Sequence, residues 1–227
     1  MPKIFRLSKA GVRLLFKVRH HKGHGIHSPF VFNFITRVIE EKTPYHAYED
    51  VRNCLKDFPV LSFQENKTHR LLFKIVNYFN IKQILELGGG IGIHSLYMTA
   101  AASDIECLSV ELTPSKYNQA QMLYNEWNHN IIQSEEQFPL INGKKDCIFV
   151  NLKNYNASHN ELVIYLLSLV HKDSVIIIDG IRTNRKLQTL WKMLVQQNDV
   201  IVSLDLFHLG ILFFDKKYYK RNYKLSF

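Results

Sequence analysis

An acidic residue followed by a run of glycines is the stretch of this chain whose residue types and spacing best suit ligand chemistry. Glu86 closes an apolar segment, and Gly88, Gly90 and Gly92 follow it at alternate positions. Glycine adopts positive φ readily and lets a ligand approach the bare backbone. A helix expected from Ile93 onward would point its free N–H groups and its positive dipole end over the loop. The stretch therefore predicts a strand, a ligand-binding loop and a helix.

The spacing of the glycines indicates which ligand the loop binds. A dinucleotide fingerprint reads G-x-G-x-x-G and needs glycine at the position that Ile93 occupies. The order acid-x-G-x-G-x-G resembles motif I of the class I methyltransferases, which bind S-adenosylmethionine (SAM). Glu111 ends the next expected strand, 19 residues after Gly92, and a carboxylate there can accept from both hydroxyls of a ribose. The resemblance implies that Glu86 orients the methionine ammonium of SAM, directly or through water, and that Glu111 holds the ribose.

Apolar segments and turn signals predict an α/β architecture around this loop. Helices are expected over 64–79, 93–102, 115–127, 159–170 and 184–197, and strands over 82–87, 105–111, 130–134, 146–150, 174–179, 200–206 and 211–214. Strands separated by helices imply a parallel sheet with right-handed crossovers and helices on both faces. The four residues 207–210 are too few for a crossover, so the last two strands form an antiparallel hairpin. A Rossmann-like, seven-stranded, mostly parallel sheet with such a hairpin is similar to the class I methyltransferase fold.

The first part of the chain predicts a separate element. Residues 1–63 are expected to form a basic helical N-terminal extension and residues 64–227 the SAM-binding domain, with an irregular stretch up to about position 63. Residues 1–22 alternate apolar and basic positions, which fits a helix that docks on the domain, pairs with a second copy of the chain, or lies on a membrane surface. Docking is the default, because large apolar side chains are costly to leave in water.

A histidine-rich segment follows these residues. His20, His21 and His24 have no Cys, Asp or Glu nearby to complete a metal-ligand set. The segment 24–30, H-G-I-H-S-P-F, resembles the start of an uncharacterised bacterial group of O-methyltransferase-like proteins. Ser28 followed by proline predicts a helix start. His27 is then either a residue of the capping loop or part of a lid over the active site.

Further candidates follow from the rule that ligands lie beyond the carboxyl ends of parallel strands. The polar residues at those positions are Ser134, Glu135, Asn151, Lys153, Asp179 and Arg182. Ser134 and Glu135 would lie near the adenine of the cofactor, although short polar residues are also ordinary turn formers. Asp179 is a candidate base or orienting group, or alternatively a cap of the turn after its strand. Lys153 and Arg182 are candidate clamps for an anionic acceptor.

The same positions argue against three other methylation chemistries. Catechol-type O-methyltransferases hold a divalent cation with an Asp after strand four and Asp-Asn after strand five, whereas this chain has Asn151 and then Asp179-Gly180. One charged oxygen ligand is too few for a hard cation, so no metal is expected. The N/D-P-P-Y/F loop of base-nitrogen methylation is absent after strand four. No cysteine stands at a strand end, as methylation of a pyrimidine carbon requires.

Composition restricts the compartment and the partners. The three cysteines, Cys54, Cys107 and Cys147, are widely spaced, which favours a reducing cytoplasm over a disulfide framework. The sequence has no apolar run of transmembrane length and no signal-peptide core. The net charge of +9 is concentrated near both ends, which suits nucleic acid, an acidic membrane surface or an anionic substrate, or is simply a solvated surface.

Two functions follow from these observations. The first is a SAM-dependent class I methyltransferase that transfers a methyl group, without a metal, to an oxygen or nitrogen of a small molecule. The alternative is a non-catalytic or nucleic-acid-associated module that keeps the methyltransferase fold and binds through its basic ends. The glycine loop and its two acids favour the enzyme.

Overall fold

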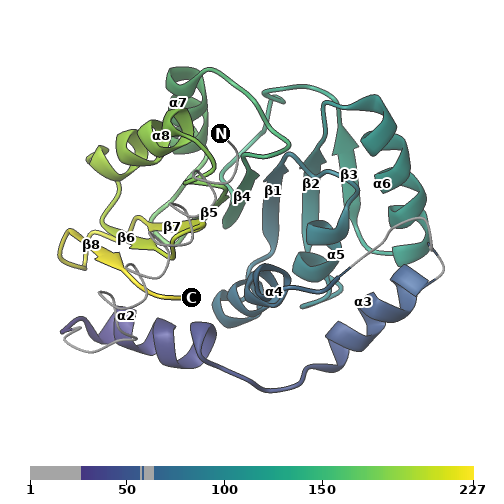
Figure 1. Cartoon of the computed structure of the whole chain (residues 1–227), viewed down its shortest axis with the longest axis horizontal. Helices are drawn as coiled ribbons and strands as arrows, with labels where there is room; N and C mark the ends of the chain where they lie inside the picture. Colours follow the sequence, from purple (N-terminus) through teal and green to yellow (C-terminus); the bar gives the residue numbers. More distant parts are fainter. Residues whose placement is uncertain (1–26, 57, 59–63) are drawn as a thin grey trace, which may run out of the picture.

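The structure is a computed structural model that describes residues 27–56, 58 and 64–227. The predicted helix over 1–22 and the residues His20, His21 and His24 lie outside the described residues. In the described part the chain forms an eight-stranded sheet with helices on both faces (Figure 1). None of the helices in this part combines the length and apolarity needed to cross a bilayer.

The strand order is β3-β2-β1-β4-β5-β7-β6-β8. The strands are β1 (Gln83–Leu87), β2 (Glu106–Val110), β3 (Ile131–Ser134), β4 (Cys147–Asn151), β5 (Val175–Asp179), β6 (Val202–Asp205), β7 (Leu209–Phe213) and β8 (Arg221–Lys224). The first five are parallel, and β7 is antiparallel to both β5 and β6. The predicted parallel sheet and its C-terminal hairpin are confirmed. The predicted number of strands is one short, because β8 adds to the outer side of β6.

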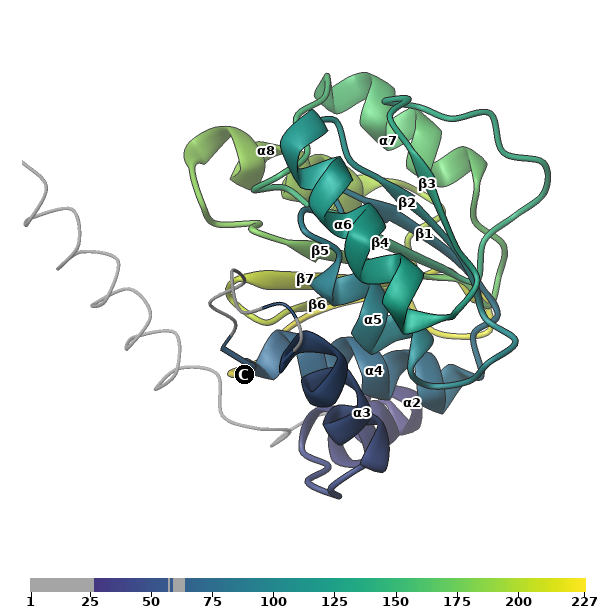
Figure 2. The same cartoon turned by 90° about the vertical axis from the view of Figure 1, so that its right-hand side faces the viewer.

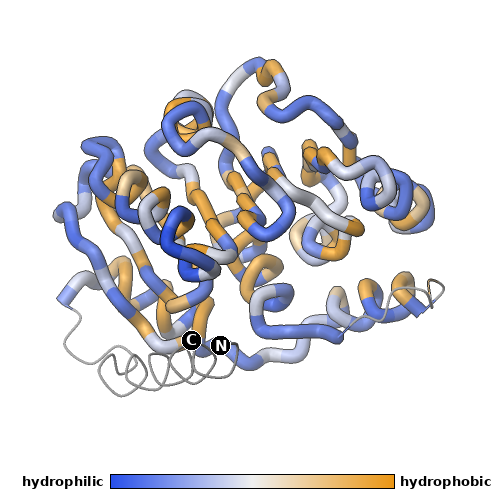
Figure 3. The backbone as a smooth tube through the Cα atoms, turned by 45° about the horizontal axis from the view of Figure 1, so that its top comes forward, coloured by the Kyte–Doolittle hydropathy of each residue, from blue (hydrophilic) through white to orange (hydrophobic). Residues whose placement is uncertain are grey.

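The helices divide into two layers. They are α2 (Pro29–Phe34), the π-helix η1 (Ile35–Ile39), α3 (His46–Lys56), α4 (Lys67–Phe79), α5 (Ile93–Thr99), α6 (Pro114–Trp127), α7 (His159–Ser168) and α8 (Arg185–Gln196). In Figure 2 the sheet lies between α7 and α8 on one side and α2, α3 and α4 on the other. Alternate residues of each strand enter the two cores: in β1, Ile84 packs towards α4, and Leu85 packs towards α7. In Figure 3 hydrophobic residues, coloured orange, are frequent along the strands at the centre of the fold.

The beginning of the described chain shares a core with the sheet. Ser28 caps α2 as predicted, accepting a hydrogen bond from the backbone N–H of Val31 (3.4 Å). Val31, Phe34 and Val38 are fully buried against α4 and the strands, at about 1.5–3 kcal/mol each. Within the stretch predicted to be irregular, 46–56 forms α3 instead. Its buried residues, Tyr48, Val51 and Leu55, recur at helical spacing and pack on α5 and α6.

Candidate functional site

The glycine loop after β1 is held close to the loop after β4. Gly88 has φ +82° and donates its backbone N–H to the carbonyl of Val110 on β2 (2.9 Å). A Cβ on Gly88 would lie 2.8 Å from the carbonyl oxygen of Asn151, and one on Gly90 would lie 2.7 Å from Nδ2 of Asn154. Positive φ therefore requires glycine at both positions, Gly90 having φ +62°, and at Gly88 the approach of the Asn151 backbone adds a second reason.

Glu86 lies buried beneath this loop. Its Oε2 accepts hydrogen bonds from the hydroxyls of Ser95 and Ser109, and the phenol of Tyr124 donates to Ser109 (3.2 Å). Its Oε1 is buried and has no hydrogen-bond partner among the residues that the structure describes. Burial raises the pKa of Glu86 to about 7, against the opposing effect of the two serine hydroxyls. An acceptor oxygen without a donor is costly inside a protein, so the geometry suits a ligand that brings an N–H group.

Sequence reasoning missed His94, which lies beside Glu86, and His69, whose ring contacts that of His94. His94, near the start of α5, has Nδ1 3.9 Å from the unpartnered Oε1, beyond hydrogen-bond distance. Its ring contacts those of Phe149 and His69 at 4.9 and 5.2 Å between centroids. Burial lowers the pKa of His94 to about 4 and that of His69 to about 3, so both imidazoles are neutral at pH 7. His94 follows Gly92 by two residues, and this position was the only signal in the sequence.

Glu111 meets the glycine loop from β2. One carboxylate oxygen accepts from the backbone N–H of Gly90 (2.6 Å) and the other from that of Thr113 (2.8 Å). The side chain is buried. Each oxygen still has a second lone pair, so the carboxylate can accept from a diol while it holds the loop. The structure therefore brings Glu86, Glu111 and the three glycines together at one edge of the sheet.

The loop after β4 carries Asn151 and Lys153. Asn151 is buried, and its Oδ1 accepts from the backbone N–H of Lys153 (3.2 Å). The Lys153 ammonium donates to Oδ2 of Asp179 at the end of β5 (2.7 Å). These strands pair with Asn151 opposite Asp179, so the three residues form one group. Sequence reasoning placed all three at this edge and missed the contact between the ammonium and the carboxylate.

A hydrogen bond between Lys116 and Asn154 joins α6 to the loop after β4, beside the glycine loop. Asn154 lies against Gly90, and its Oδ1 accepts from the ammonium of Lys116 in the first turn of α6 (2.9 Å). This contact ties the loop after β4 to the helix after β2. Both residues were missed, since neither stands at a strand end and they are 38 positions apart.

The clamp role predicted for Arg182 does not fit its contacts. Its guanidinium binds both carboxylate oxygens of Asp205 at the end of β6 and the carbonyl oxygen of Phe207 (2.7 Å). These three hydrogen bonds fix the turn between β6 and β7 and direct the guanidinium towards Asp205 and Phe207.

The three other predicted residues lie at two places: Ser134 and Glu135 lie at the end of β3, next to Glu111, whereas His27 precedes α2. Ser134 ends β3, where its carbonyl accepts from the N–H of Glu111 (3.0 Å), and Glu135 is exposed on the surface after it. His27 is exposed and precedes α2, whose Phe30 contacts Phe213 at 5.0 Å between ring centroids. Phe213 pairs with the first residue of β5, at the edge opposite Asp179. We therefore leave His27 out of the site.

Among the residues that the structure describes, no group of three or more His, Cys, Asp or Glu side chains is arranged to hold a metal ion. Asp179 instead contacts the ammonium of Lys153, which already balances its charge.

Comparison with known proteins gives structural likeness only. The sequence matches no protein-family model and no curated protein. The O-methyltransferase TomG from Streptomyces achromogenes, solved with SAM, has a TM-score of 0.56 and 15% identity, covering 76% of this chain and 91% of its own. The methyltransferase PaMTH1 from Podospora anserina, solved with S-adenosylhomocysteine (SAH), has a TM-score of 0.58 and 14% identity, covering 85% and 100%. An O-methyltransferase from Bacillus cereus, solved with SAH, has a TM-score of 0.56 and 13% identity, covering 81% and 97%. The chain thus has the Rossmann-like fold of these methyltransferases.

Proposed function

We propose that this protein is a SAM-dependent methyltransferase that methylates an oxygen, or alternatively a nitrogen, of a small molecule. The observation that carries the proposal is the unpartnered, buried Oε1 of Glu86 beneath a glycine loop. A fold alone does not specify a reaction, and this oxygen is a feature of the site itself. The structural neighbours named above, two of them O-methyltransferases, support the same reading.

The residues at the loop fit SAM in their chemistry. The carboxylate of Glu86 would accept from the methionine ammonium, and Glu111 would accept from the ribose diol with its remaining lone pairs. The positive φ of Gly88 and Gly90 gives the loop the turn against which the cofactor would lie. Bound SAM would supply a methyl group carried on a sulfonium, and the work of the protein is to hold the acceptor in line with it.

Asp179 and Lys153 are the residues that we propose for the acceptor. Oδ2 of Asp179 accepts from Lys153, and its other oxygen can accept a proton or a hydrogen bond from an acceptor hydroxyl. The ammonium offsets the negative charge that develops on the acceptor oxygen as its proton leaves. Positioning supplies much of the rate in such a direct transfer, so a weak base suffices.

Binding of SAH tests the proposal before any acceptor is known. We expect the purified chain to bind SAH in calorimetry, and Glu111→Ala to weaken binding by about 1–3 kcal/mol, the scale of lost hydrogen bonds to a charged group. Glu106→Ala is a matched control, because Glu106 is exposed at the opposite end of the same strand. No binding by the unmodified chain at millimolar SAH would refute the proposal and favour the non-catalytic alternative.

The charge around Asp179 leads to a second expectation. Once a screen with labelled SAM identifies an acceptor, EDTA should leave methyl transfer unchanged, because Asp179, the one charged oxygen ligand after β4 and β5, is already paired with Lys153. Lys153→Gln should lower the rate roughly fivefold, since the lysine is largely exposed and such a pair is worth about 1 kcal/mol. SAH affinity should not change. Activity lost to EDTA and restored by magnesium would contradict this account.

A further inference from the structure

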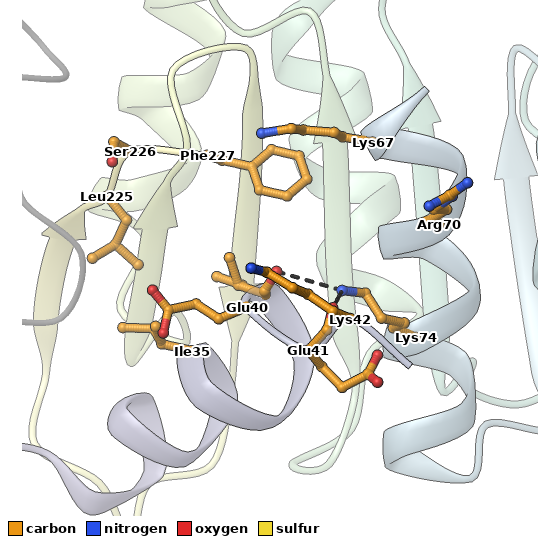
Figure 4. Close-up of a pocket in the computed structure, with 11 residues that line it drawn as sticks. Ile35, Glu40, Glu41, Lys42, Lys67, Arg70, Lys74, Leu225, Ser226 and Phe227 are labelled. Atoms are coloured by element: carbon orange, nitrogen blue, oxygen red, sulfur yellow. Dashed lines mark hydrogen bonds between the residues drawn. The ribbon is translucent and has the colours of Figure 1, made fainter. Parts of the chain in front are cut away.

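A cavity of about 660 Å³ opens between η1, α4 and the C-terminal segment (Figure 4). None of the carboxylate or glycine residues described above lines it. Its apolar wall comes from Ile35, Ile39, Leu225 and the ring of Phe227. The size lies within the range of small-molecule sites, which combine apolar walls with a few polar groups.

Two ammonium groups enter the cavity from different elements. In Figure 4 the Lys67 side chain crosses above the Phe227 ring, and the Lys42 side chain reaches into the cavity below the ring. Lys67 Nζ lies 5.5 Å from the centroid of that ring. In the described part of the chain neither lysine is paired with a carboxylate.

Two other cationic side chains of the cavity already bind protein groups. Arg70 is paired with Glu65, and the buried Lys74 ammonium donates to the carbonyls of Ile39 (3.4 Å) and Glu41 (2.9 Å). With Arg70 paired to Glu65, the lining retains three lysines and two acidic side chains, Glu40 and Glu41; Oε2 of Glu41 is buried without a hydrogen-bond partner among the described residues. The side chains of the lining therefore keep one positive charge in excess, and of the two lysines without a carboxylate partner, Lys67 lies over the Phe227 ring.

We propose that this cavity binds a small organic oxyanion, a carboxylate or phosphate on an aromatic body. Lys42 and Lys67 would bind the oxyanion by charge-assisted hydrogen bonds, which are stronger than neutral ones. The Phe227 ring would stack on the aromatic body, and Ile35, Ile39 and Leu225 would exclude water from it. The inference concerns a second site and does not depend on the proposed methyl transfer.

The test uses the full chain and three probes of similar size: phenyl phosphate, benzoate and neutral benzyl alcohol. We expect calorimetry to give at least tenfold tighter binding for one of the anions than for the alcohol, and the tighter anion assigns the oxyanion. Binding should weaken as salt is raised from 50 to 300 mM. Phe227→Leu should weaken it severalfold through loss of the ring.

The charge-neutralising double variant Lys42→Gln/Lys67→Gln should weaken binding of the anion at least tenfold. Lys186→Gln/Lys192→Gln is the matched control, because it makes the same change in net charge on exposed positions of α8, on the other face of the sheet. It should retain affinity within twofold, and both variants should bind SAH as the unmodified chain does. Equal losses in the two double variants, equal binding of the alcohol, or no anion binding at millimolar concentration would overturn the proposal.

Discussion

Gly88→Ala is expected to lower the free energy of unfolding by about 3 kcal/mol and to weaken SAH binding more than tenfold. Positive φ costs an alanine roughly 1–2 kcal/mol, and overpacking adds roughly 1–3 kcal/mol. The new methyl group would lie 2.8 Å from the Asn151 carbonyl and 3.1 Å from the backbone nitrogen of Tyr155. Backbone atoms cannot rotate away, so the loop after β4 must separate from the glycine loop. Thermal unfolding and calorimetry with SAH measure the two effects.

Gly143→Ala separates the conformational penalty from the collision. Gly143 has φ +90°, close to that of Gly88, and a Cβ there meets no heavy atom within 4 Å. This control should lose only about 1–2 kcal/mol, the penalty for positive φ, and should keep its SAH affinity. Similar losses of stability in the two variants would show that the contact between the loops is looser than the structure indicates.

Glu86→Gln should weaken SAH binding about 100-fold at pH 8. The substitution keeps the shape of the side chain and removes the charge that the ligand ammonium is proposed to meet. Charged hydrogen bonds contribute about 1.5–3 kcal/mol, and each 1.4 kcal/mol is a factor of ten in affinity. Glu161→Gln, at an exposed position on α7, makes the same change in net charge away from the site and should bind normally.

The pH dependence of SAH binding should also differ between the unmodified chain and Glu86→Gln. Because the pKa of Glu86 is raised to about 7, the carboxyl group is protonated below that pH. An ammonium ligand favours the carboxylate, so binding must displace the proton, and affinity should fall towards tenfold per pH unit below pH 7. Above pH 7 the affinity should level off. Glu86→Gln should lack this dependence, and identical pH profiles for the two proteins would contradict the role of Glu86.

The stability of the unliganded protein should follow the opposite trend. The native state holds the Glu86 proton up to about pH 7, whereas an unfolded chain releases it near pH 4.3. The contribution of this group to stability is therefore fully present below about pH 4 and is lost as the pH rises through 7. Denaturant unfolding of the unmodified chain and of Glu86→Gln between pH 5 and pH 8 isolates this contribution.

The part of the site on β1 and β2 was predictable because it depends on local sequence and strand register. Glycine at alternate positions fixes the loop, and parallel pairing puts the carboxyl ends of neighbouring strands at one edge. Leu87 therefore pairs with Val110, and the acids next to these residues converge. The hairpin of β6 and β7 was predictable for a similar reason, since its link is too short for a crossover.

The rest of the site depends on side-chain pairings that no local pattern encodes. From the sequence, Arg182 is a plausible anion clamp because it follows β5. In the structure, Asp205 at the end of β6 pairs with it instead. Lys116 and Asn154 approach each other only because α6 begins beside the loop after β4. In both cases tertiary packing determines the partner. The sequence therefore predicts that a charged residue lies near the site but does not predict what that residue binds.

The missed elements, α3 and β8, have different causes. Tyr48, Val51 and Leu55 carry a helical period in α3, but prolines at 44 and 59 and many polar residues obscured it. Residues 221–224, R-N-Y-K, have few strand-forming residues, and β8 forms because β6 offers it hydrogen-bonding partners. Since β6 and β8 both run opposite to β7, the chain only has to pass one end of β6 to reach β8.

β8 also determines how the sheet ends. Without it the sheet would end at β6, whose residues 202–205 are all buried and whose outer N–H and C=O groups would be available to any other extended chain. β8 takes up those groups and places Arg221 and Lys224, both exposed, at the margin of the sheet. Lysine and arginine on an outermost strand repel a second copy and disfavour strand-to-strand association. β8 thus gives the C-terminal edge of the sheet charged, exposed residues that disfavour pairing with another strand.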